Sequence, residues 1–413
     1  MIFENKSAIS NALAAQCNAH YGETIYRHDK RLGRYSFSHQ GLEACLDRLP
    51  YPIEWRLTAA GVRRKLDNEY LDELVKKSPE LAEFKRTRNA LTQLNGGDLR
   101  DLVMPSGHVR PVSLPFYTKT GRNQPMAARG FLLNLAPWLR STIRPHEGQV
   151  LVAADWSKQE IAIAAALSGD QALLDAYNTG DIYLALAKMA GAVPANATAK
   201  SHPDERQAYK SVQLGLGYGM GEKALARSIF NDINQGKPAP VISVEEARLQ
   251  ARDIYRWHKE TFVAYWRYLE QEARAARKDG YTTSMDGWFY FADRRTSDTK
   301  LMNYPMQSNG AAMLREAVKM LAFETSLDVV CTLHDAIYVT CAASEKNAVI
   351  ADLTAIMDRA VERVIGSAVK IEVGVNIYTR ETGYRDKRGD VMLARVVDLL
   401  DNLLGDPAQP HAA

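Results

Sequence analysis

The stretch 331-CTLHDAIYVT-340 carries a histidine and an aspartate inside a run that otherwise has the composition of a buried strand. Val329-Val330 precedes it, and Ile, Tyr and Val follow the aspartate, which is the β-branched and aromatic pattern of a strand. An unpaired buried charge is costly, so Asp335 must be protonated, pair with a cation, hold a metal or reach water in a turn. We predict a β-hairpin with His334 and Asp335 in or beside its turn.

The composition is that of a globular protein and does not indicate a particular function. The chain has 413 residues, of which 46% are hydrophobic and 24% charged, as expected for a globular protein with two to four subdomains. A formal net charge of +3 is too small to indicate a nucleic-acid binder. The basic clusters at 63–65 and 85–88 are, taken alone, typical of solvated helix faces.

The cysteines and the apolar runs indicate an intracellular protein. The four cysteines show neither a C-x-x-C motif nor a zinc-ligand spacing, so we expect reduced thiols in the cytoplasm. The N-terminal residues lack the pattern of a signal peptide, and no apolar run approaches the ~18 residues of a membrane span. We therefore expect a soluble cytoplasmic protein without a membrane partner.

A second aspartate also follows a short apolar strand. The segment 148-GQVLVAADWS-157 ends on Asp155 before the helical run 160–169. Carboxylates at the ends of two neighbouring strands can hold two Mg²⁺ ions, which prefer oxygen ligands and together clamp the oxygens of a phosphoryl transfer. A strand-end aspartate is more often a turn residue or a helix cap, so the pair by itself leaves both interpretations open.

The segment 206-RQAYKSVQLGLGYG-219 favours the first interpretation. Residues four apart advance by about 40° on a helix, so four of them share a broad face ~18 Å long. They are Arg206, Lys210, Leu214 and Tyr218. Two cations, an apolar residue and an aromatic ring suit a triphosphate at one end and a base at the other. The alternative is a solvated basic turn followed by a buried glycine-rich helix, but the three glycines favour close approach of a backbone or a ligand.

The order of five motifs resembles that of the family A DNA polymerases. They are TKTGR at 118–122, DWSKQE at 155–160, the basic segment at 206–219, PMQSNGAA at 305–312, interpreted as a helix start, and LHDA at 333–336. The resemblance covers roughly residues 70 to 385 and implies an α+β fold of the right-hand polymerase type. Such a fold has a palm with an antiparallel sheet, helical fingers and a small helical thumb.

The resemblance also divides the chain. It implies an N-terminal segment of unknown role at 1–55, a thumb at 56–117, a first part of the palm at 118–168, fingers at 169–299, a second part of the palm at 300–390, and a C-terminal helix and tail at 391–413. Local patterns predict helices between 56 and 95, a hairpin at 281–292 with Asp286-Gly287 as a two-residue turn, a helix at 311–323, a helix capped by Ser344 and stopped by Gly366, a last strand at 370–378, and a frayed tail after 404.

Roles at the matching positions follow from the resemblance alone. Asp155 and Asp335 would hold two Mg²⁺ ions, which Mn²⁺ could replace, with the backbone of Trp156 nearby. Arg206 and Lys210 would contact the triphosphate of the incoming nucleotide. Gln213 and Leu214 would also contact the nucleotide. Tyr218 would close against the new base pair, and Glu160 would be the steric gate that excludes a ribose 2′-OH. The primer and template would contact Lys119, Arg122, Gln307 and His334.

Some of these residues have simpler interpretations, and some depart from the family. Ser157 and Glu160 match a capping box, Gln307 could lie at a helix N-terminus, and His334 could be a hydrogen-bonded strand residue. The family commonly has glutamate where Ala336 stands. It also commonly has an aromatic residue at Leu214, asparagine at Gln213 and arginine at Ala162.

The resulting prediction is template-directed DNA synthesis from deoxynucleoside triphosphates on primer-template DNA, by attack of the primer 3′-OH on the α-phosphate. We expect a monomer without its own proofreading exonuclease, because the ~55 unassigned N-terminal residues are too few for that domain. An unidentified processivity factor is a further candidate partner. The alternatives are a catalytically impaired protein that binds primer-template DNA and a single-subunit RNA polymerase, and Glu160 speaks against the latter.

Overall fold

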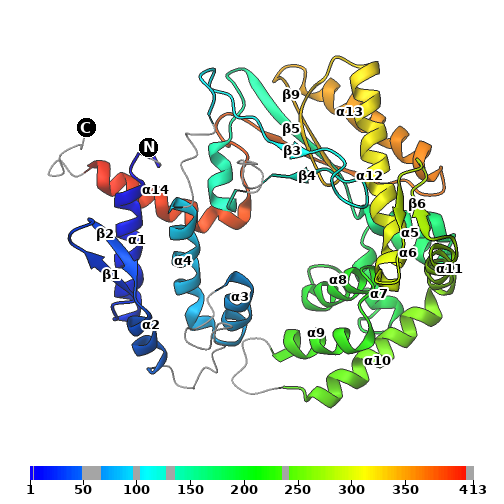
Figure 1. The fold of residues 1–413 in the computed structure, drawn as a ribbon, viewed down its shortest axis with the longest axis horizontal. Helices are drawn as coiled ribbons and strands as arrows, with labels where there is room; N and C mark the ends of the chain where they lie inside the picture. The colour runs from blue at the N-terminus through cyan, green and yellow to red at the C-terminus, as the bar shows by residue number, and fades with distance from the viewer. Residues whose placement is uncertain (3, 49–66, 96–102, 127–134, 235–240, 406–413) are drawn as a thin grey trace.

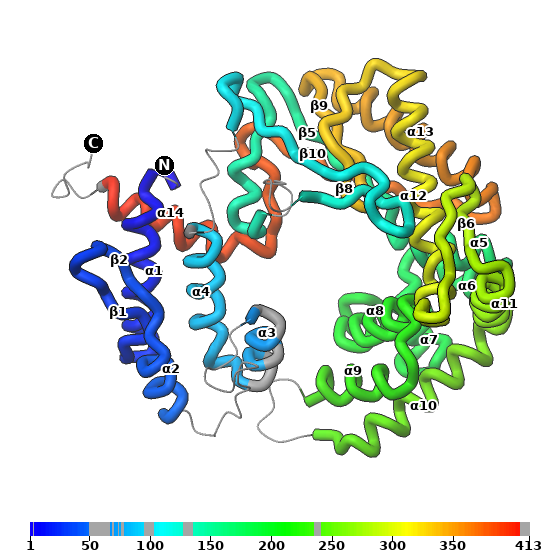
Figure 2. The backbone as a smooth tube through the Cα atoms, viewed as in Figure 1, coloured from blue at the N-terminus to red at the C-terminus, as the bar shows by residue number. Residues whose placement is uncertain are grey.

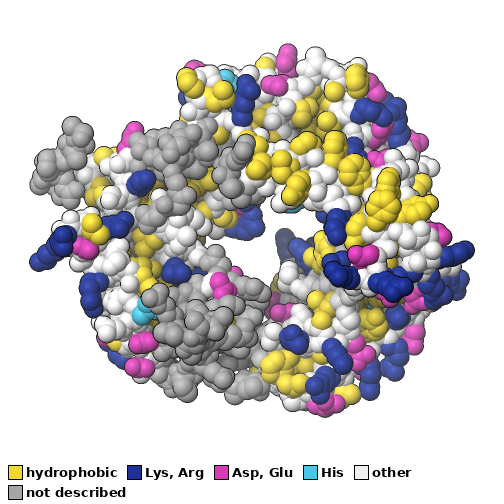
Figure 3. Space-filling model, in the orientation of Figure 1, with side chains coloured by type: hydrophobic (Ala, Val, Ile, Leu, Met, Phe, Trp, Pro, Cys, Tyr) yellow, Lys and Arg dark blue, Asp and Glu magenta, His cyan; other side chains and the backbone are white. Residues whose placement is uncertain are grey.

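The elements form an open ring around a central opening (Figures 1 and 3). The computed structural model describes the chain except residues 3, 49–66, 96–102, 127–134, 235–240 and 406–413. The first and last helices lie together on one side, a sheet lies at the top, and the helices from α8 (Pro203–Gly217) to α10 (Val244–Thr261) close the opposite side (Figures 1 and 2). Among the described helices, none combines the length and apolar composition needed to cross a bilayer.

A four-stranded antiparallel sheet carries both predicted aspartates. Its strand order is β10-β5-β9-β8. The strands are β5 (Gln149–Trp156), β8 (Asp328–Leu333), β9 (Ala336–Ala342) and β10 (Val373–Tyr378). Alternate residues of β5, among them Val150 and Val152, face a large core that also contains helices α5 (Gln159–Ser168), α12 (Asp298–Glu324) and α13 (Lys346–Ile365). The other set, Leu151 and Ala153, points to the opposite face together with Asp155.

Helices dominate the chain between α5 and α12, as predicted. They are α6 (Gln171–Asn178), α7 (Ile182–Met189), α8 (Pro203–Gly217), α9 (Glu222–Asn234), α10 (Val244–Thr261) and α11 (Val263–Asp279). Asp170, Asp181 and Ser243 begin three of them by accepting hydrogen bonds from backbone N–H groups of the first turn. The predicted hairpin follows as β6 (Tyr281–Thr283) and β7 (Phe289–Phe291), although the segment joining these strands, 284–288, is longer than two residues.

The N-terminal residues pack with the helices of the expected thumb. This side contains α1 (Lys6–Tyr21), β1 (Tyr26–Asp29), β2 (Arg34–Phe37), α2 (His39–Leu46), α3 (Asn68–Lys77), η1 (Pro79–Leu81), α4 (Ala82–Asn95) and α14 (Asp390–Gly405). The Arg395 guanidinium on α14 contacts Glu83 of α4 at 2.6 Å and Gln16 of α1 at 2.7 Å. Because one arginine joins three helices, the first helix and the last helix both support α4. The remaining short elements are β3 (Ser113–Leu114), β4 (Gln124–Pro125), η5 (Pro137–Thr142) and η6 (Lys387–Gly389).

Two predicted helix starts are wrong. The helix expected from Ala311 begins at Asp298, where Ser297 caps it, and runs for 27 residues through Pro305. Packing of its middle turns in the main core outweighs the hydrogen bond that proline removes. Ser344 does not cap α13, since the N-cap is Glu345 without a side-chain hydrogen bond.

Other predicted ends are confirmed or lie outside the description. Gly366 ends α13 as predicted, with a φ of 77°. Parts of the helical region at 56–95 fall in the range 49–66, and most of the tail falls in 406–413, so these predictions lie outside the described residues. The stop predicted at Gly96-Gly97 also lies there, although α4 ends at Asn95 as expected.

Candidate active site

The two predicted aspartates meet at the end of the four-stranded sheet. In the pairing of β5 with β9, Asp155 lies opposite Ala336, the residue directly after Asp335. His334 and Asp335 form the two-residue turn between β8 and β9, where His334 adopts a φ of 57°. The hairpin prediction is therefore confirmed, and the turn explains how the strand pattern tolerates an aspartate.

The environment of both carboxyl groups opposes their charge. Burial and the neighbouring charge of Asp335 raise the pKa of Asp155. Burial likewise raises the pKa of Asp335, and the positive charge of Arg122 acts in the opposite direction. Two half-buried carboxylates whose charged form is disfavoured are suited to bind a divalent cation. The cation would offset both the cost of burying their charge and the repulsion between them. In the described residues these two carboxylates stand without a third acidic, histidine or cysteine ligand that would complete a cluster.

Two positions beside Asp155 shape the space around it. Ala336 is buried opposite Asp155, so the glutamate that the family commonly carries there would stand next to this carboxylate. On the other neighbouring strand, Gly374 pairs with Asp155, and a Cβ atom at that position would lie 3.3 Å from Asp155 Oδ1. Small residues on both sides leave Asp155 room. The side chain of Trp156 is buried in the core, so only its backbone could serve a metal site.

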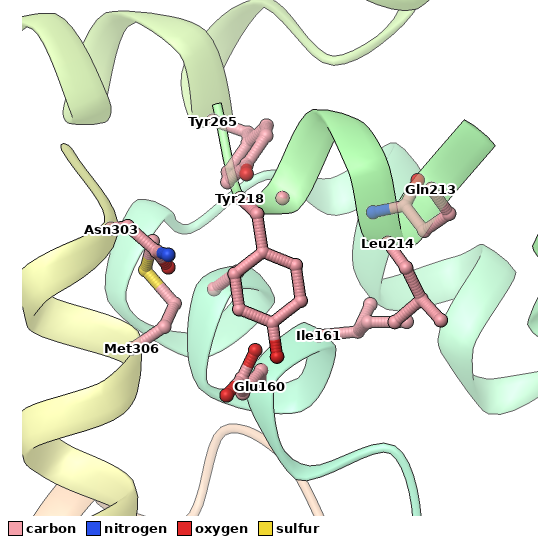
Figure 4. A pocket seen from close by; sticks show the side chains of 10 residues that line it. Glu160, Ile161, Gln213, Leu214, Tyr218, Tyr265, Asn303 and Met306 are labelled. Atoms are coloured by element: carbon pink, nitrogen blue, oxygen red, sulfur yellow. The ribbon is translucent and has the colours of Figure 1, made fainter. Parts of the chain in front are cut away.

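Glu160 forms an ion pair rather than a helix cap. The Arg122 guanidinium contacts Glu160 Oε1 at 3.0 Å, and both side chains are mostly buried. The N-cap of α5 is Lys158, which makes no side-chain capping bond, so the capping-box interpretation of Ser157 and Glu160 is wrong. The Tyr218 ring points from the end of α8 toward the Glu160 carboxylate (Figure 4). Burial and the Glu160 carboxylate raise the pKa of Tyr218 to about 12, so the phenol is neutral at ordinary pH.

The accessible side of α8 carries the basic residues, as the four-residue spacing predicts. Arg206, Lys210 and Leu214 are partly exposed there, whereas Tyr209 and Leu216 are buried on the other side. The helix ends at Gly217, so Tyr218 follows it instead of lying within it. The three glycines have different surroundings. A Cβ atom added at Gly215 would contact Met220, and one added at Gly219 would contact Thr299, whereas one added at Gly217 would point into open space.

Arg206 and Lys210 share an aromatic neighbour that sequence reasoning missed. Their cationic groups lie 5.6 and 5.9 Å from the centre of the Tyr183 ring. Arg206 also binds Asp181 Oδ2 at 2.6 Å through Nε, which lowers the pKa of Asp181 even though burial opposes that change. Lys210 has no ion pair in the described part of the chain. Asp181 was detectable in the sequence as a helix N-cap, but the pattern did not indicate its pairing with Arg206.

Gln213 is tied into a buried hydrogen-bonded network. His258 Nε2 lies 3.0 Å from Gln213 Oε1, and Trp266 Nε1 donates to His258 Nδ1 at 3.0 Å. Burial lowers the pKa of His258 to about 3, so the ring is neutral and can accept the tryptophan N–H while donating to Gln213. Gln213 and Leu214 still line a small pocket together with Glu160 and Tyr218 (Figure 4). This network anchors the middle of α8.

The four expected DNA contacts lie on different elements. Lys119 is exposed, and its ammonium lies 4.9 Å from the Tyr290 ring of β7. Trp288 Nε1 donates to the Lys119 carbonyl at 3.2 Å, so the hairpin holds the 118–122 loop. Gln307 lies in the middle of α12 and is partly buried, which excludes a helix N-terminal role, and His334 is exposed in the β8–β9 turn. Arg122 therefore acts on Asp335 and pairs with Glu160, whereas the Lys119 ammonium contacts Tyr290 of the hairpin.

Arg315 is a further residue that the sequence did not reveal. From α12 it donates to the Gly121 carbonyl at 2.9 Å and to Asp286 at 2.8 Å. A Cβ atom at Gly121 would lie 2.5 Å from Arg315 Nη1, so the glycine permits this close approach. The loop that positions Arg122 is thus fixed by contacts from residues that are distant in the chain.

The raised pKa values lead to a prediction about stability without metal. A carboxyl group whose pKa is higher in the folded than in the unfolded state destabilises the fold while it is charged, and the penalty disappears as the pH falls through the folded pKa. Asp335→Asn should therefore raise the urea concentration at the midpoint of unfolding of the metal-free protein at pH 7. The difference between the midpoints of the variant and the parent should shrink as the pH falls toward 4. Urea titrations in a chelator would measure this effect, and a lower midpoint for the variant would contradict it.

Comparisons with known proteins agree over most of the chain. The family model for DNA polymerase family A matches residues 36–379. The DNA polymerase I of Caldicellulosiruptor bescii is 25% identical over 76% of this chain and 37% of its own length, and that of Aquifex aeolicus is 26% identical over 75% and 51%. The thermostable DNA polymerase I of Thermus aquaticus is 25% identical over 84% of this chain and 38% of its own.

A solved structure shares the fold. The POL domain of Pol1 from M. smegmatis, in complex with DNA primer-template and dNTP, matches with a TM-score of 0.67 at 22% identity, over 93% of this chain and 65% of that one. This likeness confirms the predicted α+β right-hand fold with an antiparallel palm sheet. The chain spans between about a third and a half of the three curated relatives named above.

Proposed function

This chain belongs to DNA polymerase family A, and on that premise we propose that it adds deoxynucleotides to a primer 3′-OH under the direction of a DNA template. The observation that carries the proposal is the pair Asp155 and Asp335 at one end of the antiparallel sheet, where both pKa values are raised and the charge of Arg122 acts on Asp335. A strand-end aspartate that served only as a turn residue would not need a second carboxylate at its side.

The two carboxylates are the residues that would hold a divalent metal. Their donor atoms are oxygens, and their charge is disfavoured in the free protein, so the site fits Mg²⁺, with Mn²⁺ as a substitute. We propose two ions, with the Trp156 backbone as a further ligand. When bound, the metal would stabilise negative charge on the reacting phosphate and on the attacking oxygen.

We propose that α8 binds the incoming nucleotide along its accessible side. Lys210 and Arg206 would contact the triphosphate, and Arg206 must exchange its bond to Asp181 for a phosphate oxygen. Leu214, Tyr218 and Glu160 would meet the sugar and base, because these residues line one pocket. Gln213 takes part mainly by holding α8 through His258.

The primer-template would contact the expected DNA-binding residues. They are Lys119, Arg122, Gln307 and His334. The comparison structure was solved with primer-template and dNTP, which supports the same class of partner for this chain. We further propose that the protein acts as a monomer, with a thumb at 56–117, fingers at 169–299 and a palm at 118–168 and 300–390.

Glu160→Ala should relax discrimination against ribonucleotides. The side chain is held by Arg122 at 3.0 Å beside the Tyr218 ring, so it occupies fixed space next to the proposed sugar site. Its removal should increase the ratio of ribonucleotide to deoxynucleotide incorporation by about 10- to 100-fold, which corresponds to a steric penalty of about 1.4–2.7 kcal/mol. Single-nucleotide insertion with each triphosphate measures the ratio. An unchanged ratio would remove Glu160 from the gate role.

Extension of a labelled primer on a DNA template tests the proposed function. The parent should extend the primer with dNTPs and Mg²⁺ and should discriminate against rNTPs, which separates it from an RNA polymerase. One observation favours a second candidate: Ala336 stands where the family commonly has a carboxylate, as it would in a protein that binds primer-template DNA without extending it. Tight binding without extension in either Mg²⁺ or Mn²⁺ would favour that candidate.

We also propose that the chain of 413 residues does not proofread. Outside the four-stranded sheet, the described residues form two-stranded sheets. A primer with a mismatched 3′ end should remain intact in Mg²⁺ without dNTPs. Shortening of that primer by the purified chain would overturn this part of the proposal.

A further inference from the structure

A basic β-hairpin on the N-terminal side has no role in the proposed active site. The segment 26-YRHDKRLGRYSF-37 forms β1 and β2, which pair antiparallel. Four exposed cations lie on it, at Arg27, Lys30, Arg31 and Arg34, and none has an ion pair among the described residues. The family model begins at residue 36, so nearly the whole hairpin lies outside the region that it matches.

The fold holds the hairpin in one position. Tyr26 is 4% exposed and belongs to the core between α1, α2 and α4, which fixes the inner face. On α1, Asn11 donates to the Gly33 carbonyl at 2.9 Å and accepts from the Tyr35 N–H at 3.2 Å. Asp29, the sole acidic residue of the segment, accepts the N–H groups of the turn through Oδ1. The cations are therefore presented by a preorganised backbone.

The hairpin lies away from the central opening. It is at the edge of the ring, on the far side of α1 and α4 from the opening that the sheet and α8 border (Figures 1 and 2). Lys and Arg side chains gather on that edge in the space-filling view (Figure 3). A ligand of the hairpin is therefore separate from a nucleotide at Asp155 and Asp335.

We propose that the β1–β2 hairpin binds nucleic-acid phosphates as a second, sequence-independent contact outside the active site. The inference rests on the proposed function, since a DNA polymerase works on DNA. A four-residue strand is about 13 Å long, and duplex DNA carries about eight charges over that length, enough for all four cations. A lipid surface fits less well, because the tip offers one exposed large apolar residue, Leu32, instead of an apolar face.

Neutralising the hairpin tests this proposal against a matched control. The test variant is Arg27→Gln, Lys30→Gln, Arg31→Gln and Arg34→Gln combined. The control combines Arg248→Gln, Arg252→Gln, Arg256→Gln and Lys370→Gln, all exposed and distant from the hairpin. Each set lowers the formal net charge from +3 to −1, that is 3 − 4. Thermal midpoints close to that of the parent would show that both variants fold.

Fluorescence anisotropy with labelled duplex DNA between 50 and 200 mM NaCl is the first readout. The hairpin variant should bind about tenfold more weakly at the lowest salt, and its slope of log affinity against log salt should be smaller by up to about 3.6, or 0.9 for each lost contact. The control should stay within about twofold of the parent. Equal affinities and slopes for the two variants would overturn the proposal.

Protection of Lys30 from acetylation, read by mass spectrometry, locates the contact. Excess duplex DNA should protect Lys30 but not Lys370, and unchanged acetylation of Lys30 would overturn the proposal. If the hairpin variant instead loses binding to phosphatidylserine vesicles while keeping DNA affinity, the surface is a lipid contact and the proposal falls. Both readouts need no catalysis. If the parent protein binds DNA but does not extend a primer, the proposed function is wrong. The affinity and acetylation results still test the hairpin proposal in that case.

Discussion

Asp335→Ala should reduce nucleotide addition by at least about a thousandfold, which corresponds to about 4 kcal/mol in the barrier. The variant loses one of two neighbouring carboxylates at the end of the sheet, and no third ligand in the described residues completes the site. Binding of primer-template should change little, because the turn is short and Arg122 remains. The single-turnover rate at saturating dNTP, measured in Mg²⁺ and again in Mn²⁺, gives the effect directly.

Asp328→Ala is the matched control for this experiment. Asp328 begins β8, at the far end from the turn that carries Asp335, and it is exposed and accepts a hydrogen bond from Thr340. Its loss should leave the rate within about twofold of the parent, as for an ordinary surface substitution. A rate for Asp335→Ala within tenfold of the parent would contradict the metal-ligand assignment, whatever the DNA affinity.

Lys210→Ala should lower kcat/KM for dNTPs by about 100- to 1,000-fold, or about 2.7–4 kcal/mol. The ammonium lies over the Tyr183 ring and is not held by an acidic partner in the described residues, so it is free to meet a phosphate. The substitution should lower kcat as well as raise KM, because charge on the leaving pyrophosphate grows in the transition state. Pre-steady-state insertion over a range of dNTP concentrations separates the two parameters.

Arg206 provides the comparison for Lys210. Its guanidinium is already bound by Asp181 at 2.6 Å. Part of the free energy gained from a phosphate contact is therefore offset by the loss of this ion pair. We expect Arg206→Ala to have a smaller effect, of roughly tenfold, and Lys223→Ala on the exposed side of α9 to have almost none. An effect of Lys210→Ala no larger than that of Lys223→Ala would remove α8 from triphosphate binding.

Local patterns were sufficient where the physical cause was local. The apolar and β-branched runs in 148–157 and 331–340 predicted a strand ending at Asp155 and a hairpin with Asp335 in or beside its turn. The structure confirms the hairpin and ends the first strand one residue later, at Trp156. The four-residue spacing in 206–218 predicted the accessible side of α8. By contrast, the start of α12 was placed 13 residues too late, at 311 instead of 298, because Pro305 is tolerated only through its burial in the core.

Pairings between distant side chains could not be read from the sequence. Glu160 fits a capping box by spacing, yet it pairs with Arg122, 38 residues away in the chain. Arg206 has a suitable phosphate-binding position, yet Asp181 holds it in the free protein. Gln213 was predicted to contact the nucleotide, yet its amide oxygen lies within hydrogen-bond distance of His258. In each case the competing partner comes from another element, which local spacing does not describe.

Three features of this protein could be predicted from its residues alone: the strand ends near Asp155 and Asp335, the basic side of one helix, and the family that its order of motifs indicates. These features depend on periodicity and turn chemistry over a few residues. The folded chain was needed to see that β5 and β9 are neighbours with Asp155 opposite Ala336, that Arg122 pairs with Glu160, and that the N-terminal hairpin faces away from the central opening (Figure 1). Burial and electrostatic coupling depend on distances in space, so the chemistry of the site emerges when distant segments pack together.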